Sequence, residues 1–206
     1  MSVPAQSLPL TGNKFVLASS SPRRLMLVRQ LGLEPVHVCS PDIDETPHAR
    51  EKPRVYAARM SHEKALAGQT LQPGQIILAA DTTVAVGQRI LPPADDEATA
   101  RECLALLSGR RHNVYSAVTV LDEQGEARHR LAKTSVKFKR LSAAEVDAYI
   151  ASGEWEGKAG GYAIQGLASV FVNHINGSYS AVVGLPLFET RALFEAVGIH
   201  VLAPSH

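Results

Sequence analysis

The junction between a short apolar run and a capped helix, at residues 15–32, constrains the fold of this 206-residue chain more than any other stretch. The run FVLAS at 15–19 is apolar and bounded by polar residues, which is typical of a buried strand. Ser21 is then expected to cap a helix, with Pro22 at the first helical position and Gly32 just after the helix end. The stretch therefore predicts a strand followed directly by a helix, as in an α/β protein.

Strand and helix patterns alternate through the first half of the chain, and a pair of long strands follows. We expect strands at 34–40 and 75–86, a loop at 40–53, and helices at 53–68, 94–109, 142–152 and 185–198. Two long strands around a polar turn are expected at 113–142, and strands around a turn at Asn176-Gly177 are expected at 169–184. This order predicts an α/β sheet with an antiparallel portion.

The composition limits the class of protein. An apolar fraction of 45% allows a sizeable core, and 206 residues suit one domain or one core with two lobes. A formal net charge of +1 gives no reason to expect nucleic acid or a membrane as a partner, but it does not exclude a small anionic substrate. Cys39 and Cys103 show no disulfide or zinc spacing, so we interpret them as buried thiols of a reducing compartment. Because neither a secretory signal nor a transmembrane-length apolar run is present, we expect a cytoplasmic protein.

Two arginines, Arg23 and Arg24, occupy the first turn of the expected helix after Pro22. A helix N-terminus presents unpaired N–H groups and a partial positive charge, so it binds anions and disfavours cations. Each arginine there destabilises the helix by roughly 0.3–1 kcal/mol unless an anion joins them. The residues alone leave two interpretations equally open: an anion site, or a crowded cap whose arginines reach solvent or a nearby carboxylate.

Carboxylates occur at two notable places. Asp42, Asp44 and Glu45 lie within four residues of a loop, a cluster that suits a hard cation such as Mg²⁺, although an ordinary acidic loop is more frequent. Asp81 interrupts an otherwise apolar run, where a carboxylate is unfavourable unless it is paired or metal-bound. We expect Asp81 near the end of that run, where α/β sheets bind ligands, and we favour a functional role over a cap or turn aspartate.

The helix expected at 53–68 contains one candidate, Lys64. Met60 and Ala57 precede it by four and seven residues, so it lies on an apolar flank and could reach a phosphate. A lysine that extends to solvent or pairs with a nearby acid is the alternative. The apolar stripe of this helix is expected on Val55, Ala58, His62, Ala65 and Leu66.

The segment GKAGGYAIQG, at 157–166, holds four glycines around Lys158, Tyr162 and Gln165. Such a segment is either a surface connector or a loop that approaches a ligand closely. Gln165 could recognise a base edge, because its amide both donates and accepts hydrogen bonds. The eight histidines show no metal-binding spacing, and we interpret His112 as structural. No serine-hydrolase motif is present.

The order of these segments resembles the Maf family of nucleoside triphosphate pyrophosphatases. The resemblance rests on LASSSPRR, DIDET, EKA, AADTTV, SGRRHNVYSAV, GKAGGYAIQG and NGSYSAVVGLP, and it spans about residues 14–197. It implies one elongated, two-lobed α/β domain at 14–200, with a mixed sheet and a cleft between the lobes, similar to the inosine-triphosphate pyrophosphatase fold. It also implies a homodimer and, for some members, a partner in cell division. Independently of the resemblance, we expect loose termini at 1–13 and 201–206.

The resemblance further implies hydrolysis of a nucleoside triphosphate between its α and β phosphates, with a divalent metal, Mg²⁺ or Mn²⁺, as cofactor. Glu45 matches the acid of the family's metal loop, and Lys64 matches its helix lysine, which we expect to be catalytic. Asp81 matches the carboxylate assigned as proton acceptor, and it is also expected to hold the metal. These roles agree with phosphoryl chemistry, in which charge neutralisation and positioning dominate.

The residues expected to bind substrate are Ser19, Arg23, Arg24, Thr82, Lys158 and Gln165. The first three match the phosphate-contacting motif of the family, and arginine forks suit phosphate oxygens. A branch that prefers 7-methyl-GTP resembles a pattern with tryptophan after the Ser-Pro pair, glutamine after the catalytic aspartate, and Ser-Glu-Gly in the late loop. This chain has Arg23, Thr82 and Ile-Gln-Gly at those positions, so it resembles the branch that prefers dTTP and UTP.

One position departs from the family pattern. Pro93 stands where a lysine near the site is usual, and proline can neither donate a hydrogen bond nor carry charge. Either Lys158 or Arg89 compensates, or the enzyme is slower than its relatives. Two alternatives to a dTTP/UTP enzyme follow: a 7-methyl-GTP or broad-specificity pyrophosphatase, and a low-turnover nucleotide-binding regulator of septum formation.

Overall fold

The computed structural model describes residues 14–201 of the chain. Its elements, in chain order, are β1 (Val16–Ala18), α1 (Pro22–Gln30), β2 (His37–Cys39), α2 (Pro53–Leu71), β3 (Ile77–Val86), β4 (Arg89–Leu91), β5 (Pro93–Ala94), α3 (Glu97–Leu107), β6 (Arg111–Leu121), β7 (Ala127–Phe138), α4 (Ala143–Ala151), β8 (Lys158–Ala159), the 3₁₀ helix η1 (Leu167–Phe171), β9 (Val172–Asn176), α5 (Tyr179–Val183) and α6 (Leu187–Ala196). Each helix in this part of the chain is too short or too polar to traverse a bilayer. The expected loose ends at 1–13 and 202–206 lie outside the described residues, whereas Val201 is 4% exposed and packs in the core.

A mixed sheet forms the centre of the molecule, which confirms the predicted fold class. Within residues 14–201 it has seven strands, in the order β2-β1-β3-β6-β7-β9, with β4 added at the edge of β3. β1 is parallel to both β2 and β3, while the pairs β3–β6, β6–β7 and β7–β9 are antiparallel. The early strand–helix alternation therefore forms the parallel part, and the long hairpin β6–β7 forms the antiparallel part.

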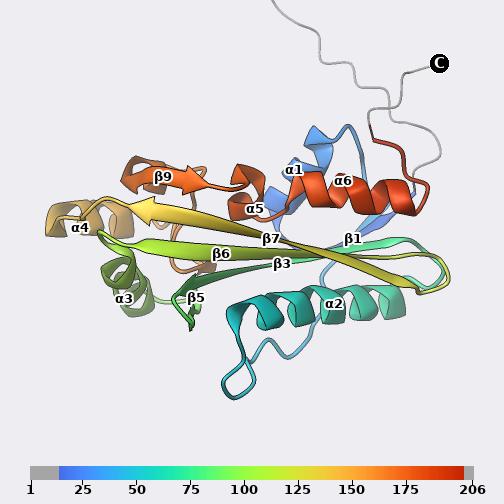
Figure 1. Ribbon diagram of the computed structural model, residues 1–206, viewed down its shortest axis with the longest axis horizontal. Helices are drawn as coiled ribbons and strands as arrows, with labels where there is room; N and C mark the ends of the chain where they lie inside the picture. Colours follow the sequence, from blue (N-terminus) through green and yellow to red (C-terminus); the bar gives the residue numbers. More distant parts are fainter. Residues whose placement is uncertain (1–13, 202–206) are drawn as a thin grey trace, which may run out of the picture.

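Helix α2 covers one face of this sheet (Figure 1). Small and branched side chains fill the interface: Val16, Ala18, Ala65, Ile77, Ala79 and Leu121. The helix approaches closely because Gly68 faces β1 and β3, and a Cβ atom at Gly68 would lie 2.8 Å from the Cβ of Ala18. Alternation along β3 places Ala79 and Asp81 on this face and Thr82 on the other.

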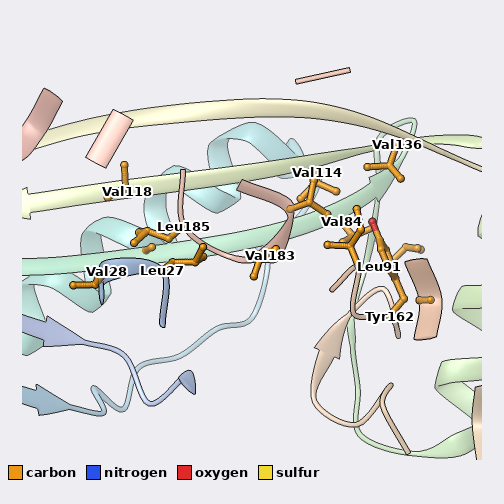
Figure 2. Close-up of a cluster of buried hydrophobic side chains, with 14 of the residues drawn as sticks. Leu27, Val28, Val84, Leu91, Val114, Val118, Val136, Tyr162, Val183 and Leu185 are labelled. Carbon is orange, nitrogen blue, oxygen red and sulfur yellow. The ribbon is translucent and has the colours of Figure 1, made fainter. Parts of the chain in front are cut away.

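The opposite face of the sheet packs against the larger core, where α1, α5 and α6 lie (Figure 1). Figure 2 shows one group of its side chains around Leu27 and Leu185 and a second group around Val84 and Tyr162, with Val183 between them. The second group lies beside the small sheet of β5 and β8, which pair in antiparallel fashion. Both groups belong to one hydrophobic core, which is therefore continuous from the main sheet to the small β5–β8 sheet.

The molecule is elongated, because the hairpin β6–β7 runs along its length (Figure 1). Helices α3 and α4 and strand β5 lie at one end, and α2 and α6 lie along the remainder. Helix α3 is capped by Asp96, whose side chain accepts a hydrogen bond from the N–H of Thr99 at 2.7 Å. Helix α4 begins with a capping box of Ser142 and Glu145.

Two local predictions are wrong. The expected apolar stripe of α2 is displaced, since Val55 is 54% and Leu66 43% exposed, while Ala57 and Met60 are fully buried. Ala65 and Gly68 of α2 face the sheet, where small residues allow the helix to approach closely. The strand expected after the Asn176-Gly177 turn is instead α5, because the Ser178 side chain caps a helix by accepting a hydrogen bond from the N–H of Ala181.

The structure also differs from two smaller predictions, about the cap at Ser21 and the burial of Cys39. Ser21 occupies the N-cap position of α1, but its side chain makes no capping hydrogen bond. Cys103 is buried as expected, whereas Cys39 is only partly buried because β2 is an edge strand. Burial raises the pKa of both thiols, so neither is activated as a thiolate.

Candidate active site

A cleft opens beside β3, where one edge of that strand lacks a neighbour. β1 pairs with β3 as far as Leu78, and β4 pairs with it from Val84 onward. No other described strand pairs with the intervening residues of β3 on that edge. A cavity of about 650 Å³ lies here, lined by the turn after β1 and by β8 with the loop that follows it. The carboxyl end of a parallel strand is a frequent ligand site in α/β sheets.

The structure brings the site residues that the family resemblance implies to this cleft, but Asp42 and Asp44 of the acidic loop do not line it. Its lining includes Ser19, Arg23, Arg24, Glu45, Lys64, Asp81, Thr82, Lys158 and Gln165. These residues come from the turn after β1, the loop before α2, the middle of α2, the middle of β3, and the segment from β8 onward. All of these residues therefore lie at the same cleft, and their chemical roles stay predictions.

Asp81, Lys64 and Glu45 form a charged cluster at the floor of the cleft. The Nζ of Lys64 lies 2.9 Å from Oδ1 of Asp81 and 3.0 Å from Oε1 of Glu45. The Oδ2 of Asp81 accepts a hydrogen bond from the Thr83 hydroxyl at 2.9 Å. The side chains of Lys64 and Asp81 are only 12% and 8% exposed. Lys64 therefore does not extend to solvent, and Asp81 is paired with side chains.

The position of Asp81 differs from the expectation in one respect. It lies in the middle of the ten-residue strand β3, not near the strand's end. It still borders an open cleft, because the neighbouring strand β1 has already ended at Ala18. The end of β1 therefore leaves room for the cleft beside Asp81. The local sequence around Asp81 does not predict this.

The carboxylates of the cluster fit a hard divalent cation. Two carboxylates and one ammonium give the cluster a net negative formal charge, and carboxylate oxygens are the ligands that Mg²⁺ prefers. Among residues 14–201 no three or more metal-binding side chains form a closed cage. Mg²⁺ is commonly held by one or two carboxylates together with water and substrate phosphates, and the pair Glu45 and Asp81 fits this mode of binding.

Arg24 is fixed in the cleft from two sides. Its Nη1 donates to the Oγ of Ser19 at 3.0 Å, and its Nε donates to the carbonyl of Gly184 at 3.0 Å. The Oγ of Ser19 also accepts from the N–H of Ser21 at 3.2 Å. The serines after β1 therefore orient an arginine and organise the turn, and they do not cap α1 through Ser21. The remaining N–H groups of Arg24 are available to a ligand.

Arg23 and Lys158 add positive charge to the same wall. Burial, and then the charge of Arg24, lower the pKa of the Arg23 guanidinium. Burial, and then the charge of Arg23, lower the pKa of the Lys158 ammonium. Burial also lowers the pKa of Arg24, and Asp81 partly offsets this effect. Cations that are desolvated and close to one another favour an anionic ligand, which would relieve both effects.

The glycine-rich segment is part of the cleft and not a surface connector, since residues 160–164 are buried. Gly160 has φ of +68°, and a Cβ there would lie 2.9 Å from Val84, so this position requires glycine. Tyr162 is fixed by a 2.8 Å hydrogen bond to Nε2 of the buried His112, which supports the structural interpretation of that histidine. Gln165 is exposed at the cleft rim.

Pro93 also lines the cleft and pairs with Ala159 across the β5–β8 ladder. Lys158, which pairs with Ala94 in the same ladder, also lines the cleft, and its Nζ donates to the carbonyl of Glu156 at 2.6 Å, whereas Arg89 is not among the lining residues. Of the two bases expected to compensate for Pro93, the structure therefore places only Lys158 at the site.

Sequence reasoning missed several groups that shape the site. The Gly184 carbonyl accepts hydrogen bonds from Arg24 and, at 3.3 Å, from the Thr82 hydroxyl, but a backbone acceptor gives no side-chain signal. Thr83 lies two residues after Asp81 in the same strand, and its polar side chain in a buried strand was a usable signal. A second cavity of about 210 Å³ adjoins the cleft and shares Glu45 and Asp81 with it.

By class, this is an α/β protein with a cleft that is lined by cationic side chains and by a lysine–carboxylate cluster. This arrangement suits a phosphorylated ligand. The chain belongs to the Maf family: the family model described as Maf-like protein matches residues 14–197.

Its relatives extend over nearly the whole chain. A dTTP/UTP pyrophosphatase of Novosphingobium aromaticivorans is 55% identical over 197 residues, which cover 95% of this chain and 98% of the relative. A dTTP/UTP pyrophosphatase of Sphingopyxis alaskensis is 56% identical over 185 residues, which cover 90% and 97%. Among solved structures, the nucleoside-triphosphatase / dITP/XTP pyrophosphatase of Mycobacterium abscessus has 23% identity and a TM-score of 0.42, over 63% of this chain and 76% of that one. This last likeness is too weak to support an argument.

Proposed function

We propose that this chain hydrolyses the α–β phosphate bond of dTTP or UTP and releases the nucleoside monophosphate and pyrophosphate. The observation that supports this reaction most is the Lys64–Asp81 pair, which lies in the same cleft as Arg23, Arg24 and Lys158. The choice of substrates rests on the relatives, since those with 52–56% identity bear the name dTTP/UTP pyrophosphatase. The proposed catalytic unit is the single domain at 14–200.

The cationic wall binds the triphosphate in this proposal. Arg24 is already oriented by Ser19 and Gly184, so its free N–H groups can contact phosphate oxygens without losing much conformational freedom. Ser19 accepts two hydrogen bonds, which leaves its own O–H free to donate to a phosphate oxygen. Arg23 and Lys158 neutralise further charge on the same group.

Glu45 and Asp81 would hold a divalent metal, Mg²⁺ or Mn²⁺, at the floor of the cleft. A bound divalent cation neutralises charge on the phosphate oxygens and helps to orient them. Lys64 lies between the two carboxylates and keeps both directed toward the cleft. The net negative charge of these three side chains supports this assignment, because a cation would balance it.

Asp81 is the proposed proton acceptor. The oxygen of a water molecule forms a bond to the α phosphorus, the bond from that phosphorus to the bridging oxygen breaks, and pyrophosphate leaves. The Asp81 carboxylate accepts the proton that the water loses. Lys64 and Thr83 orient this carboxylate through hydrogen bonds of 2.9 Å each. Lys64 is catalytic in this sense, because it also faces the reacting phosphates.

Three residues are proposed to select the nucleotide: Arg23, Thr82 and Gln165. Thr82 is held by Ser116 and Gly184 at 3.3 Å each, so its side chain presents a fixed surface to the cleft. Gln165 is exposed at the rim, where its amide can meet a base edge. This set is the basis for preferring pyrimidine triphosphates over 7-methyl-GTP.

The second candidate is a nucleotide-binding regulator with little turnover, which acts through a cell-division partner. Pro93 at the cleft favours it, because a proline supplies no charge to the reaction. Lys158, which belongs to the same β5–β8 ladder and lines the cleft, argues for an active enzyme. A cytoplasmic location, a homodimer and any division partner rest on family analogy.

A panel of triphosphates tests the proposal. Purified protein with Mg²⁺ is given dTTP, UTP, CTP, ATP, GTP and 7-methyl-GTP at one concentration, and pyrophosphate and orthophosphate are measured separately. We expect pyrophosphate as the product and the fastest release from dTTP and UTP. A preference for 7-methyl-GTP would contradict the pyrimidine assignment, and binding without turnover would favour the regulator.

A further inference from the structure

The loop that holds Glu45, at 40–52, contains no helix or strand. Its backbone therefore depends on side chains from elsewhere for its conformation. One such contact reaches Glu45 directly: the hydroxyl of the buried Tyr56 donates to the Glu45 carbonyl at 2.7 Å. Glu45 itself is half exposed, so burial alone does not fix its side chain.

Arg59 is the main anchor of the same loop. Its Nε and Nη2 donate to the two carboxylate oxygens of Glu51 at 2.9 and 2.7 Å, a bidentate pair. Nη2 also donates to the carbonyl of Thr46 at 3.1 Å, one residue from Glu45. The Oε2 atom of Glu51 also accepts from the N–H of His48 at 2.9 Å, so the same carboxylate binds both Arg59 and the loop backbone.

The Arg59–Glu51 ion pair is partly shielded from solvent, so we expect it to stabilise the loop more than an ordinary surface ion pair would. The side chains of Arg59 and Glu51 are 18% and 4% exposed. The guanidinium of Arg59 also lies 5.6 Å from the ring centre of Tyr56. Its pairing with Arg59 lowers the pKa of Glu51 to about 2, so the pair stays charged at neutral pH.

Helix α2 thus supplies both halves of the arrangement. Lys64 reaches Asp81 and Glu45 from this helix, while Tyr56 and Arg59 hold the loop that brings Glu45 to Lys64. Residues of α2 therefore contact Glu45 directly, through Lys64 and Tyr56, and hold the neighbouring loop through Arg59.

We propose that Arg59, assisted by Tyr56, is a positioning residue that holds the 40–52 loop so that Glu45 completes the cluster with Lys64 and Asp81. Arg59 touches neither substrate nor metal in this assignment. It acts through the loop, and its effect is on the affinity for the divalent cation. The inference deepens the proposed function and rests on it, because it takes Glu45 as a ligand of that cation.

Arg59→Gln tests the proposal, with Arg128→Gln as the matched control. Arg128 forms a comparable ion pair, 2.9 Å from Asp122, but at the distant β6–β7 turn. Three quantities are measured: hydrogen–deuterium exchange of the loop in metal-free protein, the dissociation constant of Mn²⁺ by electron paramagnetic resonance, and the Mg²⁺ dependence of pyrophosphate release. Arg59→Lys and Tyr56→Phe complete the set, because both are mild changes that preserve folding if Arg59→Gln does not.

We expect Arg59→Gln to speed exchange across 40–52 and to raise the Mn²⁺ dissociation constant about tenfold, the low end for residues that orient a metal ligand. The turnover rate at saturating Mg²⁺ stays within about threefold of the unmodified protein, because no reacting group is lost. Tyr56→Phe shifts both quantities in the same direction by less, and Arg59→Lys restores part of the affinity by keeping the charge.

Unchanged loop exchange and Mn²⁺ affinity in Arg59→Gln would overturn the proposal, as would equal changes in Arg128→Gln. A loss of turnover without any change in Mn²⁺ affinity would also overturn it. If the unmodified protein binds Mn²⁺ but releases no pyrophosphate, the proposed function fails, and the exchange and Mn²⁺ data still decide the role of Arg59.

Discussion

Replacing Asp81 by asparagine removes one negative charge from the floor of the cleft and keeps the size of the side chain. The proposed mechanism loses its proton acceptor, and general base catalysis contributes about 10²–10⁴-fold to enzymatic rates. We therefore expect kcat for UTP to fall by about 10²–10⁴-fold, which corresponds to about 3–5 kcal/mol of transition-state stabilisation.

The effect of this substitution on stability is expected to be much smaller. Breaking a buried ion pair usually destabilises a protein by about 3–5 kcal/mol. Lys64 keeps a second carboxylate, however, since Glu45 lies 3.0 Å from its Nζ. The loss of one charge also relieves repulsion between Asp81 and Glu45. We expect the free energy of unfolding to fall by less than about 3 kcal/mol, so the variant stays folded at 25 °C.

Thr83→Val is the matched control for this experiment. It removes the hydroxyl that donates to Asp81 at 2.9 Å but retains the carboxylate charge. Its kcat is expected to fall by less than about tenfold, because a positioning contact is lost and the proton acceptor remains. Steady-state pyrophosphate release and urea unfolding are measured for both variants. If folded Asp81→Asn keeps a kcat within about threefold of Thr83→Val, Asp81 is not the proton acceptor.

Three further predictions concern packing, pH and the departure at Pro93. Gly68→Ala places a Cβ 2.8 Å from that of Ala18, so urea unfolding should show a loss of about 1–3 kcal/mol; an unchanged midpoint would contradict the close approach of α2. Burial lowers the pKa of His112 from 6.5 to about 4, so the unfolded chain binds a proton that the folded chain does not, and stability falls as pH drops from 6.5 toward 4. His112→Gln should reduce the slope of unfolding free energy against pH in that window, and an unaltered slope would show that His112 is not its source. Lys158→Gln should lower kcat/KM at least about tenfold while Pro93→Lys changes it by less than about threefold; a sharp gain in Pro93→Lys would show that the proline limits turnover.

The strand–helix alternation was predictable because its signals are local. Proline at the start of α1, glycine after its end, and the capping residue of α4 each act within a few residues. The phase of α2 was not predictable from its apolar residues, because the apolar Val55 and Leu66 are exposed in the structure. Close approach at Gly68 decides that phase, and it depends on the distant residues Ala18 and Ile77.

The site was predictable as a set of residues but not as a geometry. A buried carboxylate at Asp81 and adjacent arginines at the start of α1 are unusual enough to be noticed in the sequence, and the family resemblance gave their order. The cleft itself depends on the end of β1 beside an unbroken β3, which is a property of strand pairing. The Gly184 carbonyl and the Arg59 anchor came only from the structure, since a backbone acceptor and an ordinary ion pair give no distinctive pattern.

The position at which water enters the product tests the central claim most directly. UTP is hydrolysed by the purified protein with Mg²⁺ in ¹⁸O-enriched water, and the products are analysed by ³¹P nuclear magnetic resonance. The account predicts UMP that contains one ¹⁸O on its phosphorus and pyrophosphate without label, because water attacks the α phosphorus beside Asp81. Label in pyrophosphate, or UDP and orthophosphate as products, would contradict it.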